Sequence, residues 1–309
     1  MTTPFSITEP GLYHDVPERD YHADPCPEPS LSSSVARTLF NRSPFHAWLE
    51  HPRLGGAGKM PEAPSAGMIL GSTVHALLAG ETGNLDFADF DDFRSKDARA
   101  WRDGVLAAGR TPVLERVRVA AEPVAGAIRE CVAAGFSDDQ NPLLAGRAEV
   151  VAAWRDDGGV RGGREAWCRA RFDRVAFTST HATILDFKVT EDAAPERLER
   201  HVIDMGYHVQ AAFYLRGLYA CRPRSEKGEM RQVSFVFYFC EAPTLSVVPV
   251  VLSQAHLNLG DKIADHAIRA WAGCMAAGGQ WPSYCSGGRA LALSVPDWYL
   301  RRVEERLGA

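Results

Sequence analysis

The strongest constraint on the fold is a change from helical to period-two hydrophobic spacing at about residue 146. Three runs with strand character follow one another, separated by turn segments rich in Gly or in Ser and Thr. The runs are GRAEVVAAW (146–154), AWCRARFDRVAF (166–177) and ATILDFKV (182–189). Because side chains alternate between the two faces of a strand, and short turns join antiparallel neighbours, the runs predict a three-stranded meander.

Segments with helical spacing of apolar residues, and a second pair of predicted strands, lie before and after the predicted meander in the sequence. The predicted helices lie within residues 30–51, 68–80, 95–135, 196–220 and 255–277, with a short one at 296–308; the further strands are 232–240 and 244–251. This order predicts an α/β class, with a central mixed β-sheet flanked by helices.

The chain length and composition suit one sizeable core. Of the 309 residues 46% are apolar, which is ordinary for a globular protein. Residues 1–30 are rich in Pro, Asp and Glu and predict an irregular N-terminal arm. Residues 31–309 then form a single domain, with a helical part at 31–140 and a core that contains the predicted strands at 141–309.

Charge and cysteine usage narrow the possible functions. The net charge of −5 does not indicate a strongly basic polyanion binder, although a local basic stripe is enough to bind nucleic acid. Seven scattered cysteines without a C-x-x-C pair predict reduced thiols and disfavour a zinc or iron–sulfur site. No apolar run reaches the roughly 20 residues of a membrane span, and the start has no leader pattern, so a cytoplasmic protein without a membrane partner is expected.

The last run of the meander carries Asp186 and Lys188 two residues apart, hence on one face of the predicted strand. The preceding run alternates charged and apolar residues, which places Arg169, Arg171 and Asp173 together on one face. If the two strands pair through the TSTH turn, Asp173 and Asp186 converge. On that face the two arginines could clamp phosphate groups of DNA.

Two carboxylates and a lysine at one sheet edge match what hydrolysis of a phosphodiester needs. Asp173, Asp186 and the backbone carbonyl of Phe187 would hold Mg²⁺, for which Mn²⁺ would substitute, while Lys188 would orient the attacking water. A D-x-K sequence by itself is more commonly explained by exposed salt bridges on a hairpin.

Short motifs occur in one order from about Leu31 to the C-terminus. They are LSSSVARTLF with SPFHAW, LGSTVHALLAG, GRAEVVAAW, CRARFDRV, ILDFKVTEDA, GYHVQAAFY, and a late WP followed by PDW. Together they resemble the nuclease domain of RecE-type exonucleases (exodeoxyribonuclease VIII) and its PD-(D/E)XK relatives, such as lambda exonuclease and the RecB nuclease domain. The resemblance implies a restriction-endonuclease-like PD-(D/E)XK core.

The resemblance also implies roles for individual residues. His75 of a G-x-x-x-H helix and Glu149 of the first strand would join Asp173 and Asp186 as metal ligands. Lys188 would be catalytic, and the Q-x-x-x-Y pair would lie beside the active site as Gln210 and Tyr214. Val189 replaces the Thr common after this lysine, which leaves the metal set intact. Without the motif, His75 would be a packed histidine and the Q-x-x-x-Y pair a partly buried Tyr capped by a Gln.

The function that the resemblance implies is exonucleolytic digestion of double-stranded DNA ends, 5′ to 3′, in recombination or repair. Its implied partners are a single-strand annealing protein and further copies of the chain in a ring-shaped trimer or tetramer. Two alternatives remain open at this point. One is a structure-specific or endonucleolytic PD-(D/E)XK nuclease, and the other is a non-catalytic DNA-binding relative.

Overall fold

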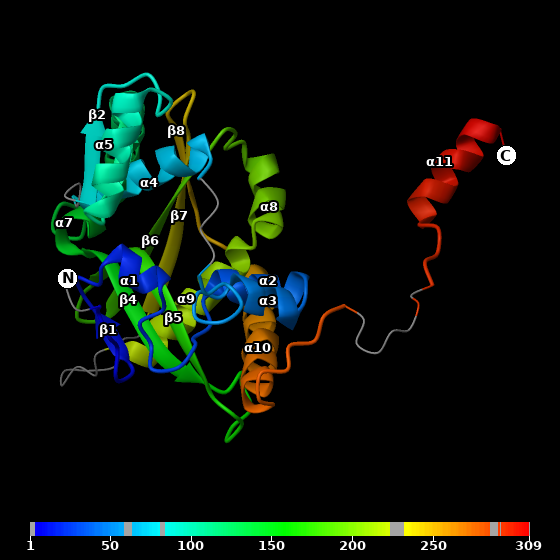
Figure 1. The fold of residues 1–309 in the computed structure, drawn as a ribbon. Helices are drawn as coiled ribbons and strands as arrows, with labels where there is room; N and C mark the ends of the chain where they lie inside the picture. Colours follow the sequence, from blue (N-terminus) through cyan, green and yellow to red (C-terminus); the bar gives the residue numbers. More distant parts are fainter. Residues whose placement is uncertain are drawn as a thin grey trace.

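A computed structural model describes residues 4–58, 64–80, 84–222, 232–284, 290 and 292–308. Its central feature is a six-stranded sheet with helices on both faces (Figure 1). The strands are β1 (Gly11–Tyr13), β4 (Arg147–Asp156), β5 (Ala166–Phe177), β6 (His181–Thr190), β7 (Gln232–Glu241) and β8 (Ser246–Val250). The predicted mixed α/β fold is confirmed.

Neighbouring strands of the sheet follow the order β1-β4-β5-β6-β7-β8. All pairs are antiparallel except β6 and β7, which are parallel over ten residues from His181 opposite Gln232 to Thr190 opposite Glu241. A parallel pair needs a crossover, and helices α8 (Pro195–Asp204) and α9 (Tyr207–Cys221) supply it. The meander predicted from the period-two runs is therefore the β4-β5-β6 part of the sheet.

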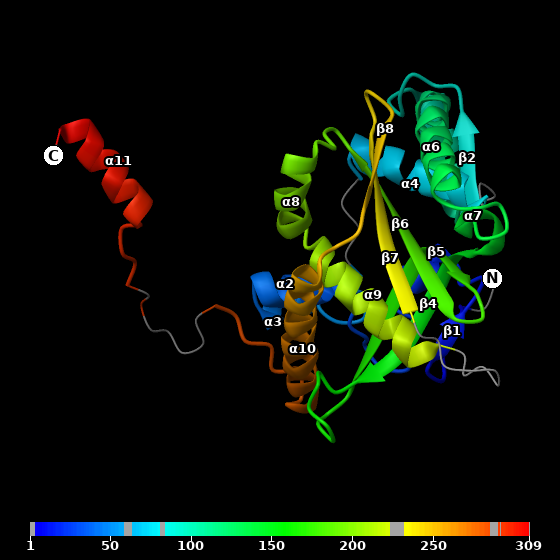
Figure 2. The ribbon, with the colours of Figure 1, turned by 180° about the vertical axis from the view of Figure 1, so that it is seen from behind.

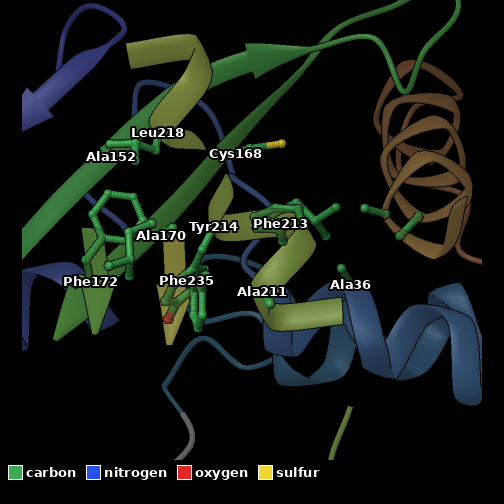
Figure 3. Packing of buried hydrophobic residues seen from close by; sticks show 14 of the residues in the cluster. Ala36, Ala152, Cys168, Ala170, Phe172, Ala211, Phe213, Tyr214, Leu218 and Phe235 are labelled. Atoms are coloured by element: carbon green, nitrogen blue, oxygen red, sulfur yellow. The ribbon is translucent and has the colours of Figure 1, made fainter. Parts of the chain in front are cut away.

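One face of the sheet packs against α9, which Figure 2 shows in front of the strands, and α10 (Gln254–Ala276) lies beside α9. Helices α2 (Ser33–Asn41) and α3 (Pro44–Glu50) complete this side. Figure 3 shows the contact between α9 and the strands, where Tyr214 lies toward Phe172 and Phe235. Phe213 lies 5.0 Å from Trp154 between ring centroids, and Tyr214 lies 5.4 Å from Phe172.

The opposite face of the sheet packs against α4 (Ala66–Ala79) and α6 (Glu115–Gly135). Buried apolar residues of these two helices meet Leu185 and Phe187 of β6 and Cys240 of β7. Alternation along β6 thus divides its side chains between two cores, with Ile184 in the α9 layer and Leu185 in the α4 layer. This alternation decides which layer each polar residue of β6 faces.

Three features were not expected from the sequence. The arm predicted to be irregular contains β1, which pairs with β4, and helix α1 (Glu18–His22). Its residues Ile7, Val16 and Cys26 are buried against β4 and β5. A small parallel pair, β2 (Leu85–Ala88) and β3 (Thr111–Leu114), flanks helix α5 (Lys96–Ala107). Strands β1, β2 and β3 have three or four residues each, which is too few for an alternation of apolar and polar residues to be recognised in the sequence.

The remaining helices are short or peripheral. They are α7 (Pro142–Ala145) and α11 (Asp297–Leu307). Helix α11 has no buried residue and stands apart from the rest of the molecule in Figures 1 and 2. Among the described residues, no helix has both the length and the apolar character to cross a membrane.

Candidate active site

The candidate site lies where the backbone ladder between β5 and β6 stops. The two strands pair from Phe177 opposite Ala182 up to Arg174 opposite Leu185, and the next pair would be Asp173 with Asp186. That pair does not form. Instead, the side chain of Asp173 accepts a hydrogen bond from the Phe187 backbone N–H at 2.8 Å. The carboxylate of Asp173 therefore occupies the position that a backbone carbonyl would have in a continued ladder.

Strand β4, the other neighbour of β5, is also distorted next to Asp173. Strands β4 and β5 pair on both sides of Glu149, but Glu149 and Asp173 are missing from the ladder and Glu149 has a φ of 53°. Phe172 and Val175 also belong to the same core cluster, although residues three apart on a regular strand face opposite sides. A non-glycine residue at positive φ is strained, so the fold stabilises an irregularity where polar groups gather.

Three groups with metal-binding atoms meet at this distortion. Nδ1 of His75 lies 3.3 Å from Oδ2 of Asp173. One ligand atom from each of His75, Glu149 and Asp173 lies within 4.8 Å of the other two. His75 reaches the site from α4, whose first turn is capped by the Ser65 side chain. The three residues that the resemblance grouped as metal ligands with Asp186 are thus adjacent.

Asp186 is completely buried on the adjoining strand. Its Oδ2 accepts a hydrogen bond of 2.6 Å from Nε2 of Gln210, and its Oδ1 forms an ion pair with Nζ of Lys188. Among the described residues, no group makes a hydrogen bond of acceptable geometry to Oδ1. A buried carboxylate oxygen with only an ion-pair partner has spare capacity to coordinate a cation.

The backbone of Phe187 links the two carboxylates. Its N–H points toward β5 and reaches Asp173. Because the N–H and C=O of one strand residue point to the same side of the strand, the carbonyl of Phe187 also faces the gap between β5 and β6. The Phe187 ring lies on the α4 layer, edge-on to His75 with 6.2 Å between ring centroids. The predicted carbonyl ligand therefore faces the same gap as Asp173.

One face of α9 contacts the D-x-K strand from the other layer. Gln210 donates a hydrogen bond to Asp186, and Tyr214 lies one helical turn further along the same face of α9. Tyr214 is only 9% exposed and packs edge-to-face on Phe172. Tyr214 is therefore part of the contact between α9 and the sheet.

Burial and mutual charge shift the pKa values of the acidic groups in the metal-free site. Burial raises the pKa of Asp186 to about 6, and the charge of Asp173 adds to this against the attraction of Lys188. Burial likewise raises the pKa of Glu149 to about 7, opposed by Arg171. For Asp173 burial acts in the same direction, but the neighbouring His75 outweighs it and lowers the pKa.

The two basic groups of the site are both held in the charged form. Burial favours neutral His75, yet Asp173 raises the histidine pKa to about 9. The pKa of Lys188 is raised because Asp186 and Asp173 outweigh the burial. Without a metal ion, cationic side chains therefore neutralise the carboxylates, and a metal ion would have to displace the proton of His75.

The two arginines predicted to contact DNA have different environments. Arg169 is 4% exposed and pairs with Asp24 at 3.2 Å, while it also donates to the Ser30 carbonyl at 2.7 Å. Arg169 thus joins the N-terminal arm to β5, and the predicted DNA contact was wrong for this residue because its side chain is buried. Arg171 stays at the site, in an ion pair with Glu149.

Residues 30–287 match the family model of the PD-(D/E)XK nuclease superfamily. The chain belongs to the PD-(D/E)XK nuclease superfamily. The matched region begins at Ser30 and includes every residue of the site described above.

Two solved structures are similar at low sequence identity. A proposed exonuclease from Eubacterium rectale is 14% identical, with a TM-score of 0.49, over 88% of this chain and 92% of its own. The protein SSO0001 is 9% identical, with a TM-score of 0.27, over 74% of this chain and 83% of its own. No curated protein matches the chain significantly.

Proposed function

We propose that this nuclease-superfamily chain is a Mg²⁺-dependent exodeoxyribonuclease that hydrolyses double-stranded DNA from its ends. The observation that carries the proposal is the gap between β5 and β6, where Asp173, Asp186 and Lys188 lie close enough for each charge to act on the others. A buried pair of carboxylates with one amine is costly unless it has a function, because each buried ion loses several kcal/mol of hydration.

The donor set suits a hard divalent cation. Asp173, Asp186 and the Phe187 carbonyl offer oxygen ligands, Glu149 adds a third carboxylate, and His75 offers one nitrogen. When bound there, Mg²⁺ would neutralise charge on the scissile phosphate and activate a water molecule. Oδ1 of Asp186, which lacks a hydrogen bond among the described residues, supports coordination at that atom. Mn²⁺ has the same ligand preferences and is expected to substitute.

The protein's own residues orient the reacting groups. The ammonium of Lys188 is paired with Asp186 and would donate a hydrogen bond to the attacking water or to a phosphate oxygen, which stabilises the charge that develops in hydrolysis. Gln210 fixes the carboxylate of Asp186 in one orientation. Arg171 pairs with Glu149 in the metal-free site, and it would be released to hold a phosphate once Glu149 binds the cation.

The preference for ends, the 5′ to 3′ direction and the role in recombination or repair rest on the RecE-type resemblance. A ring-shaped trimer or tetramer would keep DNA bound by enclosing it, which suits a chain of net charge −5. We include in the proposal a single-strand annealing protein as the partner that would receive the product strand.

The test compares linear duplex DNA, labelled at the 5′ or the 3′ end, with covalently closed circles, in Mg²⁺ and in chelator. Labelled nucleotides are expected from linear DNA in Mg²⁺, with the 5′ label released first, and closed circles are expected to stay intact. Cutting of circles would refute an exonuclease and favour an endonuclease. A folded protein that releases nothing in Mg²⁺ or Mn²⁺ would favour a non-catalytic relative. The mass in solution tests the ring, and a stable monomer would contradict it.

A further inference from the structure

Two aromatic rings surround the ammonium group of Lys188. Its Nζ lies 4.9 Å from the ring centroid of Tyr207 and 5.8 Å from that of Phe237. Phe237 is the residue of β7 directly opposite Asp186, and it is fully buried. Both distances are within the ~6 Å over which a ring face attracts a cation. The lysine is thus held by one carboxylate and two rings.

The position of Tyr207 is itself fixed by its surroundings. Tyr207 is the first residue of α9, directly after Gly206, which ends the preceding turn with a φ of 69°. A side chain at Gly206 would collide with Arg37 of α2. The Tyr207 ring also packs on Phe237 and Phe239, with centroids 5.6 and 5.7 Å away. The ring therefore has little freedom to move away from Lys188.

Tyr207, Gln210 and Tyr214 follow one another at spacings of three and four residues, so they share one face of α9. Gln210 contacts Asp186, and Tyr207 contacts Lys188. The helix face therefore orients both polar residues of the D-x-K strand, one by a hydrogen bond and the other by a ring. Tyr207 did not enter the set predicted from the sequence.

A lysine side chain has four rotatable carbon bonds, and two carboxylates at this site attract its ammonium group. Attraction alone would permit several orientations, including one directed at Asp173. The rings restrict the ammonium to one side while leaving its N–H groups free to donate, because a ring face accepts no strong hydrogen bond. This is a means of orientation that another carboxylate could not supply without neutralising the cation.

We propose that Tyr207 is a positioning residue whose ring, together with Phe237, holds the Lys188 ammonium in the orientation that serves hydrolysis. The inference deepens the proposed function and rests on it for the effect on rate. The contact between ring and ammonium group is independent of any activity, so it can be tested separately.

The direct test is an NMR spectrum of protein labelled with ¹³C at Cε of lysine. The chain has five lysines, so the spectrum is simple, and Lys188→Arg identifies the signal of Lys188. Ring currents are expected to move the Lys188 Hε signals upfield from those of the other lysines. The displacement is expected to persist in Tyr207→Phe and to fall in Tyr207→Leu. Tyr219→Leu, on an exposed part of the same helix, is the matched control and is expected to leave it unchanged.

Activity on linear duplex DNA is the second readout. We expect kcat to fall roughly 2- to 30-fold in Tyr207→Leu with little change in KM, and to stay near the parent value in Tyr207→Phe, given the usual strength of a cation–π contact. Equal loss in both variants would point to the hydroxyl and overturn the inference. A parent spectrum without an upfield Lys188 signal would also overturn it, whatever the fate of the variants. If no variant or parent has nuclease activity but the spectra behave as expected, the proposed function fails while the ring contact stands.

Discussion

The replacement of Gln210 by Leu tests the hydrogen bond that fixes the buried carboxylate. Nε2 of Gln210 donates to Oδ2 of Asp186 at 2.6 Å, and Asp186 has no exposure to solvent. Leu has a similar volume and cannot donate, so the variant removes the hydrogen bond while filling the space. The ionised form of Asp186 then loses a partner, whereas the protonated form loses little.

The size of the effect follows from the strength of hydrogen bonds to charged groups, about 1.5–3 kcal/mol. That corresponds to a further rise of about one to two units in the pKa of Asp186, which is already raised to about 6 in the parent. A raised acid pKa contributes stability below the unfolded pKa of about 4 and loses it as pH rises through the folded pKa. Variant and parent share the unfolded pKa, so the pH-dependent part of their stability difference depends on the two folded pKa values; it is absent below about pH 5, where both folded proteins hold the proton, and complete above about pH 8.

Urea unfolding in the presence of a chelator, at pH 5 and at pH 8.5, measures this difference. The free energy of unfolding of Gln210→Leu is expected to fall below that of the parent by about 1.5–3 kcal/mol more at the higher pH than at the lower. Gln254→Leu removes an exposed glutamine at the start of α10 and serves as the control. A difference between Gln210→Leu and the parent that is the same at both pH values would refute the role of this hydrogen bond.

Three further predictions concern the rest of the site. Calorimetric titration with Mn²⁺ should give an affinity that rises from about pH 5.5 to 9, because Asp186, Glu149 and His75 have pKa values of about 6, 7 and 9 and must lose their protons to bind the ion. An affinity that does not change with pH would exclude these residues as ligands. Lys188→Met should keep Mn²⁺ affinity within a few-fold while kcat falls by about 10²–10⁴, and a parallel loss of affinity would contradict a role in the chemical step. Arg169→Leu removes one of the ion-pair partners of Asp24, which keeps His51 and Arg53, and should cost about 1.5–3 kcal/mol in urea unfolding; a variant as stable as the parent would show that the ion pair does not join the arm to β5.

The sequence was most informative where alternation was regular. Asp186 and Lys188 could be placed on one face from their spacing alone, and the structure joins them in an ion pair. Residues 166–172 alternate as expected, with Cys168, Ala170 and Phe172 in the core. The parallel partner β7 could not be paired by spacing, because the crossover through α8 and α9 determines where it lies.

The rest of the site depends on geometry that spacing does not encode. The positive φ of Glu149 and the interrupted ladder at Asp173 place the two carboxylates side by side, and a regular strand pattern cannot reveal either feature. Arg169 alternates correctly, but its burial depends on Asp24, which lies 145 positions earlier in the chain and in an arm predicted to be irregular. Tyr207 stands three residues before Gln210, and helical spacing could have identified it as a neighbour of the D-x-K strand.

The most direct test of the central claim is nucleotide release from linear duplex DNA over a series of Mg²⁺ concentrations, comparing the parent with Asp186→Asn. Asp204→Asn, which changes an exposed carboxylate on α8, is the matched control. The account predicts that Asp186→Asn folds and loses more than about a hundredfold in activity, since changes to groups that merely support a metal ligand already cost 10- to 100-fold, while Asp204→Asn stays at the parent level. Mg²⁺-dependent release by Asp186→Asn at the parent rate would contradict the assignment of this carboxylate, and with it the active site between β5 and β6.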